Sequence, residues 1–226
     1  MKIIAIIPAR GGSKGVPKKN IRLIYNKPLI VWSIEQALAS KFINRVIVST
    51  DCIEIANISK NAGAEVPELR PSQLAQDETA TEPVLIHAIK NWCSVQGDDI
   101  IMLLQPTSPM RLSKSIDNAI TYFKKNKSDS LVSVSENHSF FWKNINFPEP
   151  LYDYKNRLRR QDINKKDKLY RENGSIYMTR VNILLNQKNR LGGKISMFLM
   201  EESESLEIDS ELDFFIIEEL MKRNKL

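Results

Sequence analysis

The sequence predicts an α/β domain built on a mostly parallel sheet with helices on both faces. Short apolar runs rich in β-branched residues, typical of buried strands, alternate along the chain with apolar residues at helical spacing. This alternation is typical of βαβ units, whose crossovers are right-handed and whose ligands bind at the carboxyl ends of the strands. The chain has 226 residues, of which 42% are hydrophobic, and this is enough for one such domain with a full core.

In the first half of the chain, strands and helices follow one another regularly. Apolar, β-branched runs predict strands at residues 2–8, 45–50 and 99–105. Apolar residues at helical spacing predict the helices at residues 28–40, 52–63 and 84–92. Gly63 is the expected C-cap of the second helix, because glycine adopts the left-handed conformation at low cost.

The second half continues the alternation after one interruption. A helix is predicted at residues 113–127, with Ser113 as a candidate N-cap, and a strand at 130–135. The later elements are strands at 175–180 and 194–200 and helices at 181–187 and from 210 to about 223. We therefore expect a single domain over residues 1–226.

Residues 137–169, which we call the arm, interrupt the pattern with polar, aromatic and proline residues that have no steady periodicity. A flexible surface insertion is one interpretation, although structureless loops of this length are uncommon in compact domains. We favour a protruding arm that packs on a second copy of the chain, because its aromatic side chains are too many for a purely solvated loop. These side chains are Phe140, Phe141, Trp142, Phe147, Tyr152 and Tyr154.

Composition limits the function classes. The net charge of +6 suits nucleic acid, an anionic membrane surface or small polyanionic substrates. Cys52 and Cys93 are far apart and form no CxxC pattern, which indicates a reducing compartment rather than a disulfide scaffold. No run reaches the roughly 18 apolar residues of a membrane span, and the N-terminus lacks the features of a signal peptide. We expect a soluble, cytoplasmic protein.

The loop after the first strand, IPARGGSKGVPKKN, concentrates glycines and cations at a predicted strand end. Glycines let the backbone N–H groups approach an anion, and cations neutralise phosphate charge. The spacing matches neither a P-loop nor a dinucleotide fingerprint. A solvated basic turn is the alternative, but the position at the carboxyl end of the first strand favours phosphate binding. We call residues 9–20 the opening loop.

Five further segments follow the opening loop in the order VIVSTD, LRPSQLAQDETAT, LLQPTSPMR, RENGSIY and SLEIDSELD. Together they resemble the acylneuraminate cytidylyltransferases, the CMP-sialic acid synthetase family, over nearly the full chain. Relatives that activate the eight-carbon sugar KDO differ in the opening loop. The resemblance implies a three-layer α/β/α fold of the nucleotide-diphospho-sugar transferase type, Rossmann-like, with residues 137–169 as a dimerisation insertion in a homodimer.

The resemblance also implies a reaction. The anomeric hydroxyl of a nine-carbon acidic sugar would attack the α-phosphorus of CTP with Mg²⁺ as cofactor and release pyrophosphate. Such a transition state spreads negative charge over phosphate oxygens, so that catalysis consists mostly of positioning and electrostatic stabilisation.

The family's motifs carry roles onto individual residues of this chain. The nucleotide-binding residues implied are Arg10, Gly12, Ser13, Lys14, Lys19, Asn20, Arg70 and Thr81, with Lys19 nearest the α-phosphate. Gln105, Asn173 and Tyr177 would contact the sugar, although Tyr177 also suits an ordinary strand position. Arg160 of RRQD, matched only across a gap, would reach a phosphate of the partner chain.

Acidic residues gather near the C-terminus in SLEIDSELD, whose residues 205–209 we call the acidic segment. In an extended segment Glu207 and Asp209 face the same side and can converge on one ion, and Mg²⁺ takes one or two carboxylates plus substrate phosphates. Some relatives have Asp at the position of Glu207, so Asp209 is the stronger candidate for direct ligation and joins Lys19 and Arg10 as a catalytic residue. Glu211 and Asp213 would favour the dipole of the last helix.

Other roles and functions compete with these. Arg111 suits either a carboxylate partner or a solvated helix-entry cation, and Asp51 suits an N-cap. A nucleic-acid-binding module is motivated by the pI of 9.2, but an RRM signature, zinc ligands and a basic recognition helix are missing. Within the enzyme class, legionaminate or pseudaminate compete as the sugar, because KNRLGGK at residues 188–194 differs from the aromatic pair of some sialate enzymes.

Overall fold

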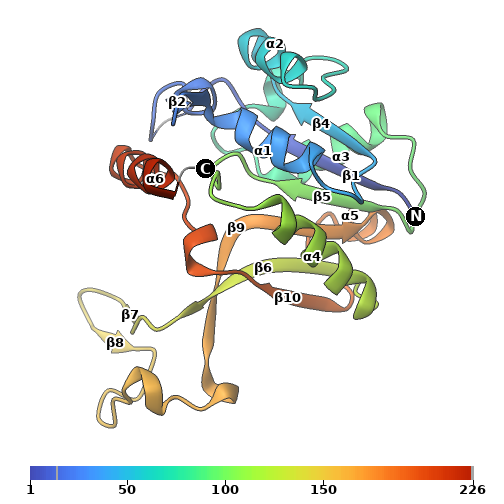
Figure 1. Ribbon diagram of the computed structural model, residues 1–226. Helices are drawn as coiled ribbons and strands as arrows, with labels where there is room; N and C mark the ends of the chain where they lie inside the picture. Colours follow the sequence, from blue (N-terminus) through green and yellow to red (C-terminus); the bar gives the residue numbers. More distant parts are fainter. Residues whose placement is uncertain (14, 225–226) are drawn as a thin grey trace.

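The computed structural model describes residues 1–13 and 15–224, and its centre is one mixed sheet of six strands (Figure 1). The order across the sheet is β10-β6-β9-β5-β1-β4. The strands are β1 (Ile3–Pro8), β4 (Arg45–Ser49), β5 (Ile100–Leu104), β6 (Ser130–Asn137), β9 (Leu169–Arg180) and β10 (Ile195–Leu199). Only β9 runs antiparallel to its neighbours β5 and β6, so the predicted mixed, mostly parallel sheet is confirmed.

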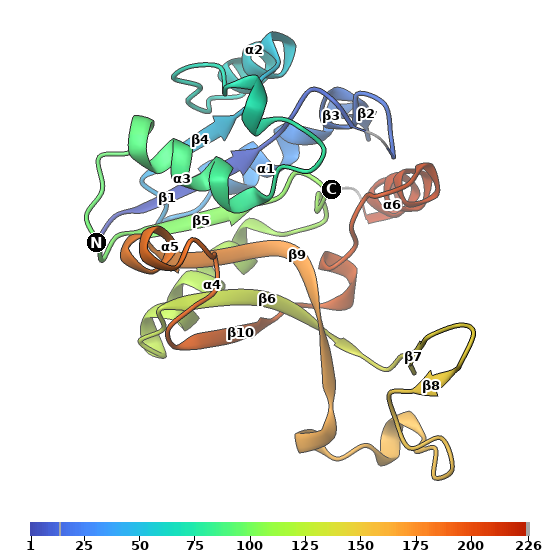
Figure 2. The same ribbon diagram turned by 180° about the vertical axis from the view of Figure 1, so that it is seen from behind.

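Helices cover both faces of this sheet, which confirms the three-layer prediction (Figures 1 and 2). Successive side chains of a strand point to opposite faces, and β1 accordingly sends Ile3, Ala5 and Ile7 into one core and Ile4 and Ile6 into the other. The first core is closed by α1 (Leu29–Leu38), α2 (Ile53–Asn61) and α4 (Ser113–Lys125), and the second by α3 (Thr81–Trp92) and α5 (Val181–Gln187).

A third, smaller core fixes the C-terminal helix α6 (Glu211–Asn224). Phe214, Ile217 and Met221 of α6 pack with Val16 of the opening loop and with Ile208 of the acidic segment. The short hairpin of β2 (Leu23–Ile24) and β3 (Lys27–Pro28) contributes Ile24. The acidic segment is therefore anchored next to the opening loop.

The largest difference from the predicted elements concerns β9. The sequence predicted a strand at 175–180, whereas β9 begins at Leu169 because its first half pairs with the end of β6, Asn137 opposite Leu169. Outside the core both faces of this ribbon are exposed at residues 169–172, so no apolar alternation marks it. In α4, Leu112 rather than Ser113 occupies the N-cap position.

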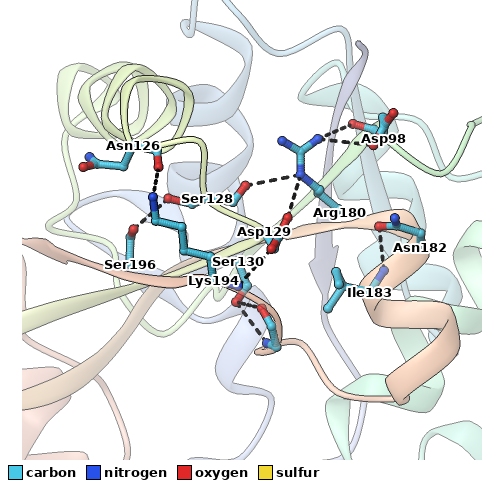
Figure 3. A network of polar contacts seen from close by, with 11 residues as sticks. Asp98, Asn126, Ser128, Asp129, Ser130, Arg180, Asn182, Ile183, Lys194 and Ser196 are labelled. Carbon is cyan, nitrogen blue, oxygen red and sulfur yellow. Dashed lines mark hydrogen bonds and ion pairs between the residues drawn. The ribbon is translucent and has the colours of Figure 1, made fainter.

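At the end of the sheet opposite the carboxyl ends of β1 and β5, a polar network ties three strands and their loops together (Figure 3). Arg180, the last residue of β9, lies 3.3 Å from Asp129 and donates to the carbonyl oxygen of Ser128. Lys194, just before β10, donates to the Asn126 carbonyl at 2.7 Å. The polar side chains at this end of the sheet thus hold the strands and their loops together.

The arm projects from the sheet on the ribbon that β6 and β9 form (Figures 1 and 2). It contains the hairpin β7 (Trp142–Lys143) and β8 (Glu149–Pro150) and the turns η3 (Arg160–Asp162) and η4 (Lys165–Asp167). Phe140 and Tyr152 lie with ring centroids 4.5 Å apart, whereas Ile145 is 95% and Phe147 76% exposed. None of the helices in residues 1–13 and 15–224 is long and apolar enough to cross a membrane.

Candidate active site

A pocket of about 420 Å³ opens where β1 and β5 end. Ligands of open α/β sheets bind at this edge, because the loops that follow parallel strands meet there. The pocket walls include eight of the residues assigned from the sequence: Arg10, Ser13, Lys19, Asn20, Arg70, Thr81, Gln105 and Asp209. Segments that lie far apart in the chain are thus brought to one site.

The opening loop is held in shape by its own polar groups. Asn20, which is buried, donates its Nδ2 hydrogen bond to the Arg10 carbonyl oxygen at 3.0 Å. The backbone N–H of Gly11 donates to Oδ1 of Asp51 at 3.0 Å. Lys18 adopts a left-handed backbone conformation, after which the turn η1 (Lys19–Ile21) directs Lys19 into the pocket.

Lys19 links the opening loop to the acidic segment. Its Nζ donates to the Ile208 carbonyl oxygen at 2.8 Å and lies 3.7 Å from Oδ1 of Asp209. Gly15 makes a second contact, because a Cβ at this position would come closer than 3.0 Å to the Asp209 carbonyl oxygen. Only glycine fits between the two segments without a shift.

Arg10 is paired across the mouth of the pocket. Its Nη1 lies 2.6 Å from Oδ1 of Asp77, a residue of the segment between η2 (Ser72–Leu74) and α3. A second cation, Arg70, is 5% exposed, and burial lowers its pKa. Three cations, Arg10, Arg70 and Lys19, thus line this pocket together with the acids Asp77 and Asp209.

Asp51 has a different role from the helix N-cap suggested by the sequence. Cys52 precedes α2, and no side chain caps that helix. The Asp51 carboxylate instead accepts from Gly11 and lies 3.8 Å from Nη2 of Arg70. Asp51 thus braces the opening loop against a buried cation, which the STD spacing alone did not reveal.

The two acids of the acidic segment differ in their surroundings. The Asp209 side chain is 79% exposed at the pocket, whereas the Glu207 carboxylate lies against Gly174. Burial, and then the charge of Asp209, raise the pKa of Glu207 above the ordinary carboxyl value. Gly174 has a φ of +61°, and a Cβ there would overlap with the Glu207 carboxylate and lie 2.7 Å from Oε1 of Gln105. Glu207 and Gln105 therefore meet at this glycine.

Two residues assigned to the sugar face the interior. Asn173 is completely buried, and its amide bonds to protein groups only. Tyr177 is 6% exposed, donates to Glu172 at 2.9 Å and carries Arg190 against its ring, 4.7 Å from the centroid. Burial, and then the bond to Glu172, raise the pKa of Tyr177. Neither residue lines the pocket, and their sugar contacts stay predictions.

The other assigned residues have these positions. Gly12 is exposed on the opening loop, where an added Cβ would meet no described atom within 4 Å, and Arg160 is exposed in the arm. Lys14 lies outside the described residues. Arg111 is not a solvated cation, because it is 1% exposed and donates to the Ser175 carbonyl at 2.7 Å and to Ser33, and the carboxylate whose charge acts on it is that of Glu204. Burial lowers its pKa to about 9.

Contacts at the start of α6 support the prediction that Glu211 and Asp213 serve this helix. Oδ2 of Asp213 accepts from the backbone N–H of Ser210 at 2.8 Å, and Oγ of Ser210 accepts from the backbone N–H of Asp213 in return. Glu211 binds Arg22 through both carboxylate oxygens. These two acids serve the start of α6, whereas Asp209 lines the pocket and Glu207 lies behind it against Gly174.

Comparison with known proteins decides the family. A family model described as Cytidylyltransferase matches residues 4–226. The chain belongs to the cytidylyltransferase family. This membership makes it a nucleotidyltransferase and confirms the family predicted from the six segments, whereas a nucleic-acid-binding module is not supported.

Individual relatives of this cytidylyltransferase cover nearly all of it. Post-translational flagellin modification protein B of Campylobacter coli is 36% identical and spans 100% of this chain and 97% of the relative. CMP-N,N'-diacetyllegionaminic acid synthase of Legionella pneumophila is 35% identical and spans 100% and 98%. N-acylneuraminate cytidylyltransferase of Escherichia coli O18:K1:H7 is 34% identical, and the match spans 94% of this chain but 50% of that protein.

A solved structure supports the fold alone. CMP:2-keto-3-deoxy-manno-octonic acid synthetase, solved in complex with CTP, superposes with a TM-score of 0.73 at 17% identity. The match covers 99% of this chain and 100% of that chain. The fold match therefore extends over nearly the whole chain.

Proposed function

We propose that this cytidylyltransferase joins CTP to a nine-carbon acidic sugar of the sialic acid type and releases pyrophosphate. The observation that carries the proposal is Lys19, whose ammonium group lies between the opening loop and the Ile208–Asp209 backbone at the edge of the pocket. The ammonium group that would bind a phosphate thus lies next to the acidic segment at the edge of the pocket. The names of the relatives, one an N-acylneuraminate and one a diacetyllegionaminic acid enzyme, support this class of sugar.

The side chains at this point also suit Mg²⁺. Among the described residues no group of three or more His, Cys, Asp or Glu side chains is arranged to hold a metal, so any ion here has two carboxylates at most. Two carboxylates plus substrate phosphates are a usual donor set for Mg²⁺. The raised pKa of Glu207 arises partly from Asp209, and a cation between the two would relieve this repulsion. We propose Asp209 and Glu207 as the residues that hold it.

When bound, the ion would neutralise charge that develops on phosphate oxygens. The chain's own residues supply the remaining stabilisation. Arg10 and Lys19 place two positive charges at the pocket, and the Asn20 and Asp51 contacts fix the loop that carries them, so little reorganisation is needed during the reaction. A phosphate that binds Arg10 competes with the Asp77 carboxylate at 2.6 Å.

The arm supports a homodimer. Ile145, Phe147 and Trp142 expose 95%, 76% and 51% of their surface, although the same segment has an aromatic interior. Exposed aromatic and aliphatic side chains in one projecting segment are typical of a protein interface. We propose that the arm packs on a second copy of the chain and that Arg160 contacts the nucleotide phosphates of that copy.

The test is pyrophosphate release from CTP and Mg²⁺ with N-acetylneuraminate, legionaminate and pseudaminate assayed in parallel. Asp209→Ala should abolish release, whereas Asp98→Ala removes a similarly exposed acid at the opposite end of the sheet and should leave it unchanged. Release with one sugar supports the reaction and identifies its substrate. No release with any of the three sugars from folded protein would contradict the proposal.

A further inference from the structure

A buried polar junction lies directly behind the pocket, centred on Asn173. Oδ1 of Asn173 accepts from Oγ of Ser133 at 2.6 Å and from the backbone N–H of Ser175 at 3.3 Å. Its Nδ2 donates to Oγ of Ser205 at 2.8 Å and to Sδ of Met200 at 3.5 Å. A carboxamide offers two acceptor sites and two hydrogens, so all four are used within the protein and none is left for a sugar hydroxyl.

The junction joins three parts of the chain. Ser133 lies in β6 where the pairing with β9 shifts register, Asn173 lies in β9, and Ser205 follows the turn η5 (Glu202–Glu204). Ser205 also donates its own Oγ hydrogen bond to the Glu201 carbonyl at 2.8 Å. The side chain of Asn173 therefore fixes the first residue of the acidic segment to the centre of the sheet.

Ser205 has a second tie to β9, because Nη2 of Arg171 donates to its carbonyl oxygen at 3.4 Å, and the acidic segment is anchored again further along. The backbone N–H of Ile208 donates to the Thr107 carbonyl at 2.9 Å, and Lys19 binds the Ile208 carbonyl. Glu207 lies between these anchors and the Ser205 anchor, with its carboxylate against Gly174, the residue after Asn173. Without the Asn173 bond, Ser205 is held only by the longer bond from Arg171 and by its own bond to Glu201, so the Glu207 carboxylate is less firmly placed against Gly174.

We propose that Asn173 is a positioning residue for the acid pair: it holds Ser205 so that the Glu207 carboxylate lies against Gly174, next to Gln105 of the pocket that Asp209 lines, and it does not touch the sugar. This inference rests on the function proposed above. It gives the RENG segment a physical role, because Asn173 supplies the anchor and Gly174 supplies the space in which the Glu207 carboxylate lies.

The experiment uses the whole chain and Mn²⁺ as a spectroscopic probe, with affinity in the presence of CTP measured by electron paramagnetic resonance. Asn173→Ser removes the donor of the bond to Ser205, and Ser205→Ala removes the acceptor of the same bond while Asn173 stays in place. Each should weaken Mn²⁺ binding about tenfold, the lower end of the effect of groups that orient metal-bound carboxylates. The double variant should be little worse than either single one, because both remove the same bond. The KM for the sugar should stay within about twofold of the wild-type value.

Two outcomes would overturn the inference. One is a KM for the sugar raised tenfold or more in Asn173→Ser with Mn²⁺ affinity unchanged, which would make Asn173 a sugar ligand. The other is wild-type Mn²⁺ affinity in both single variants. Thermal unfolding checks that each variant folds, and Ser205→Ala, which deletes one oxygen, keeps the test available if Asn173→Ser does not fold. A wild-type enzyme that releases no pyrophosphate would contradict the proposed function instead, whatever the variants bind.

Discussion

Replacing Gly15 with alanine is expected to damage catalysis without unfolding the protein. The new Cβ would come closer than 3.0 Å to the Asp209 carbonyl oxygen, a backbone atom that has no rotamer with which to move aside. To restore an ordinary contact of about 3.4 Å, the opening loop and the acidic segment must separate by about 1 Å. That movement carries Lys19 away from Ile208 and Asp209, which it now contacts at 2.8 and 3.7 Å.

A displacement of about 1 Å in a reacting site costs on the order of a hundredfold in rate, equivalent to about 2.7 kcal/mol of transition-state stabilisation. We therefore expect kcat/KM for pyrophosphate release to fall by about a hundredfold in Gly15→Ala. The same separation disturbs the packing of Val16 and Ile208 in the third core, so the thermal unfolding midpoint should also fall, and activity is compared at a temperature at which the variant is folded.

Two further glycines make this experiment specific. Gly97→Ala, at the opposite end of the sheet, adds a Cβ at an ordinary 3.4 Å from Asn182 and should keep full activity. A Cβ on Gly12 would meet no described atom within 4 Å, so any loss in Gly12→Ala reports contact with the nucleotide rather than strain in the protein. Wild-type kcat/KM in Gly15→Ala would refute the reasoning, because it would mean that the contact between the two segments does not position Lys19.

Three other perturbations have expected outcomes. Asp77→Asn should tighten CTP binding, measured by calorimetry, by up to about fivefold, because it removes the partly exposed carboxylate that competes with phosphate for Arg10, and such an ion pair is worth up to about 1 kcal/mol. Weaker CTP binding would instead indicate that Asp77 contacts the nucleotide directly. Because burial and Asp209 raise the pKa of Glu207, metal-dependent activity should fall on acidification at a higher pH than an ordinary carboxyl group would dictate. In the metal-free protein, Asp209→Asn should lower the pKa of Glu207 measured by NMR titration, and an unchanged pKa would contradict the coupling. Phe147→Asp should convert a dimer to a monomer in light scattering, and a monomeric wild-type protein would exclude the proposed role of the arm.

The sequence predicted those parts of the fold in which one physical pattern determines one structure. β1, β5 and α5 lie within a residue of their expected bounds, because each buries apolar side chains at a regular period. The same rule failed for the first half of β9, which pairs with β6 but buries neither face at residues 169–172. A strand that is stabilised by backbone pairing alone leaves no hydrophobic pattern in the sequence.

The site was predictable where the residue type itself carries the chemistry. Arg10, Lys19 and Asp209 are charged residues at predicted strand ends or in an acidic run, and the structure brings them to one pocket. Asp51 was expected to cap a helix, and the buried partners of Asn173 were not predicted, because a short polar side chain has several possible partners and the sequence does not say which lies nearby. Gly11 lies 40 residues before Asp51 and Ser205 lies 32 residues after Asn173, so only the tertiary fold brings these partners together.

The antiparallel strand β9 explains why the arm and the acid pair lie at the same end of the molecule. In a sheet with only parallel strands, each strand is joined to the next by a crossover connection that passes over one face of the sheet. β9, in contrast, lies between β5 and β6 and runs antiparallel to both. Its first residues emerge from the arm at the carboxyl ends of β5 and β6, and Asn173 and Gly174 follow at once as the strand enters the core. One strand therefore carries the arm, the anchor of the acidic segment and the space for Glu207.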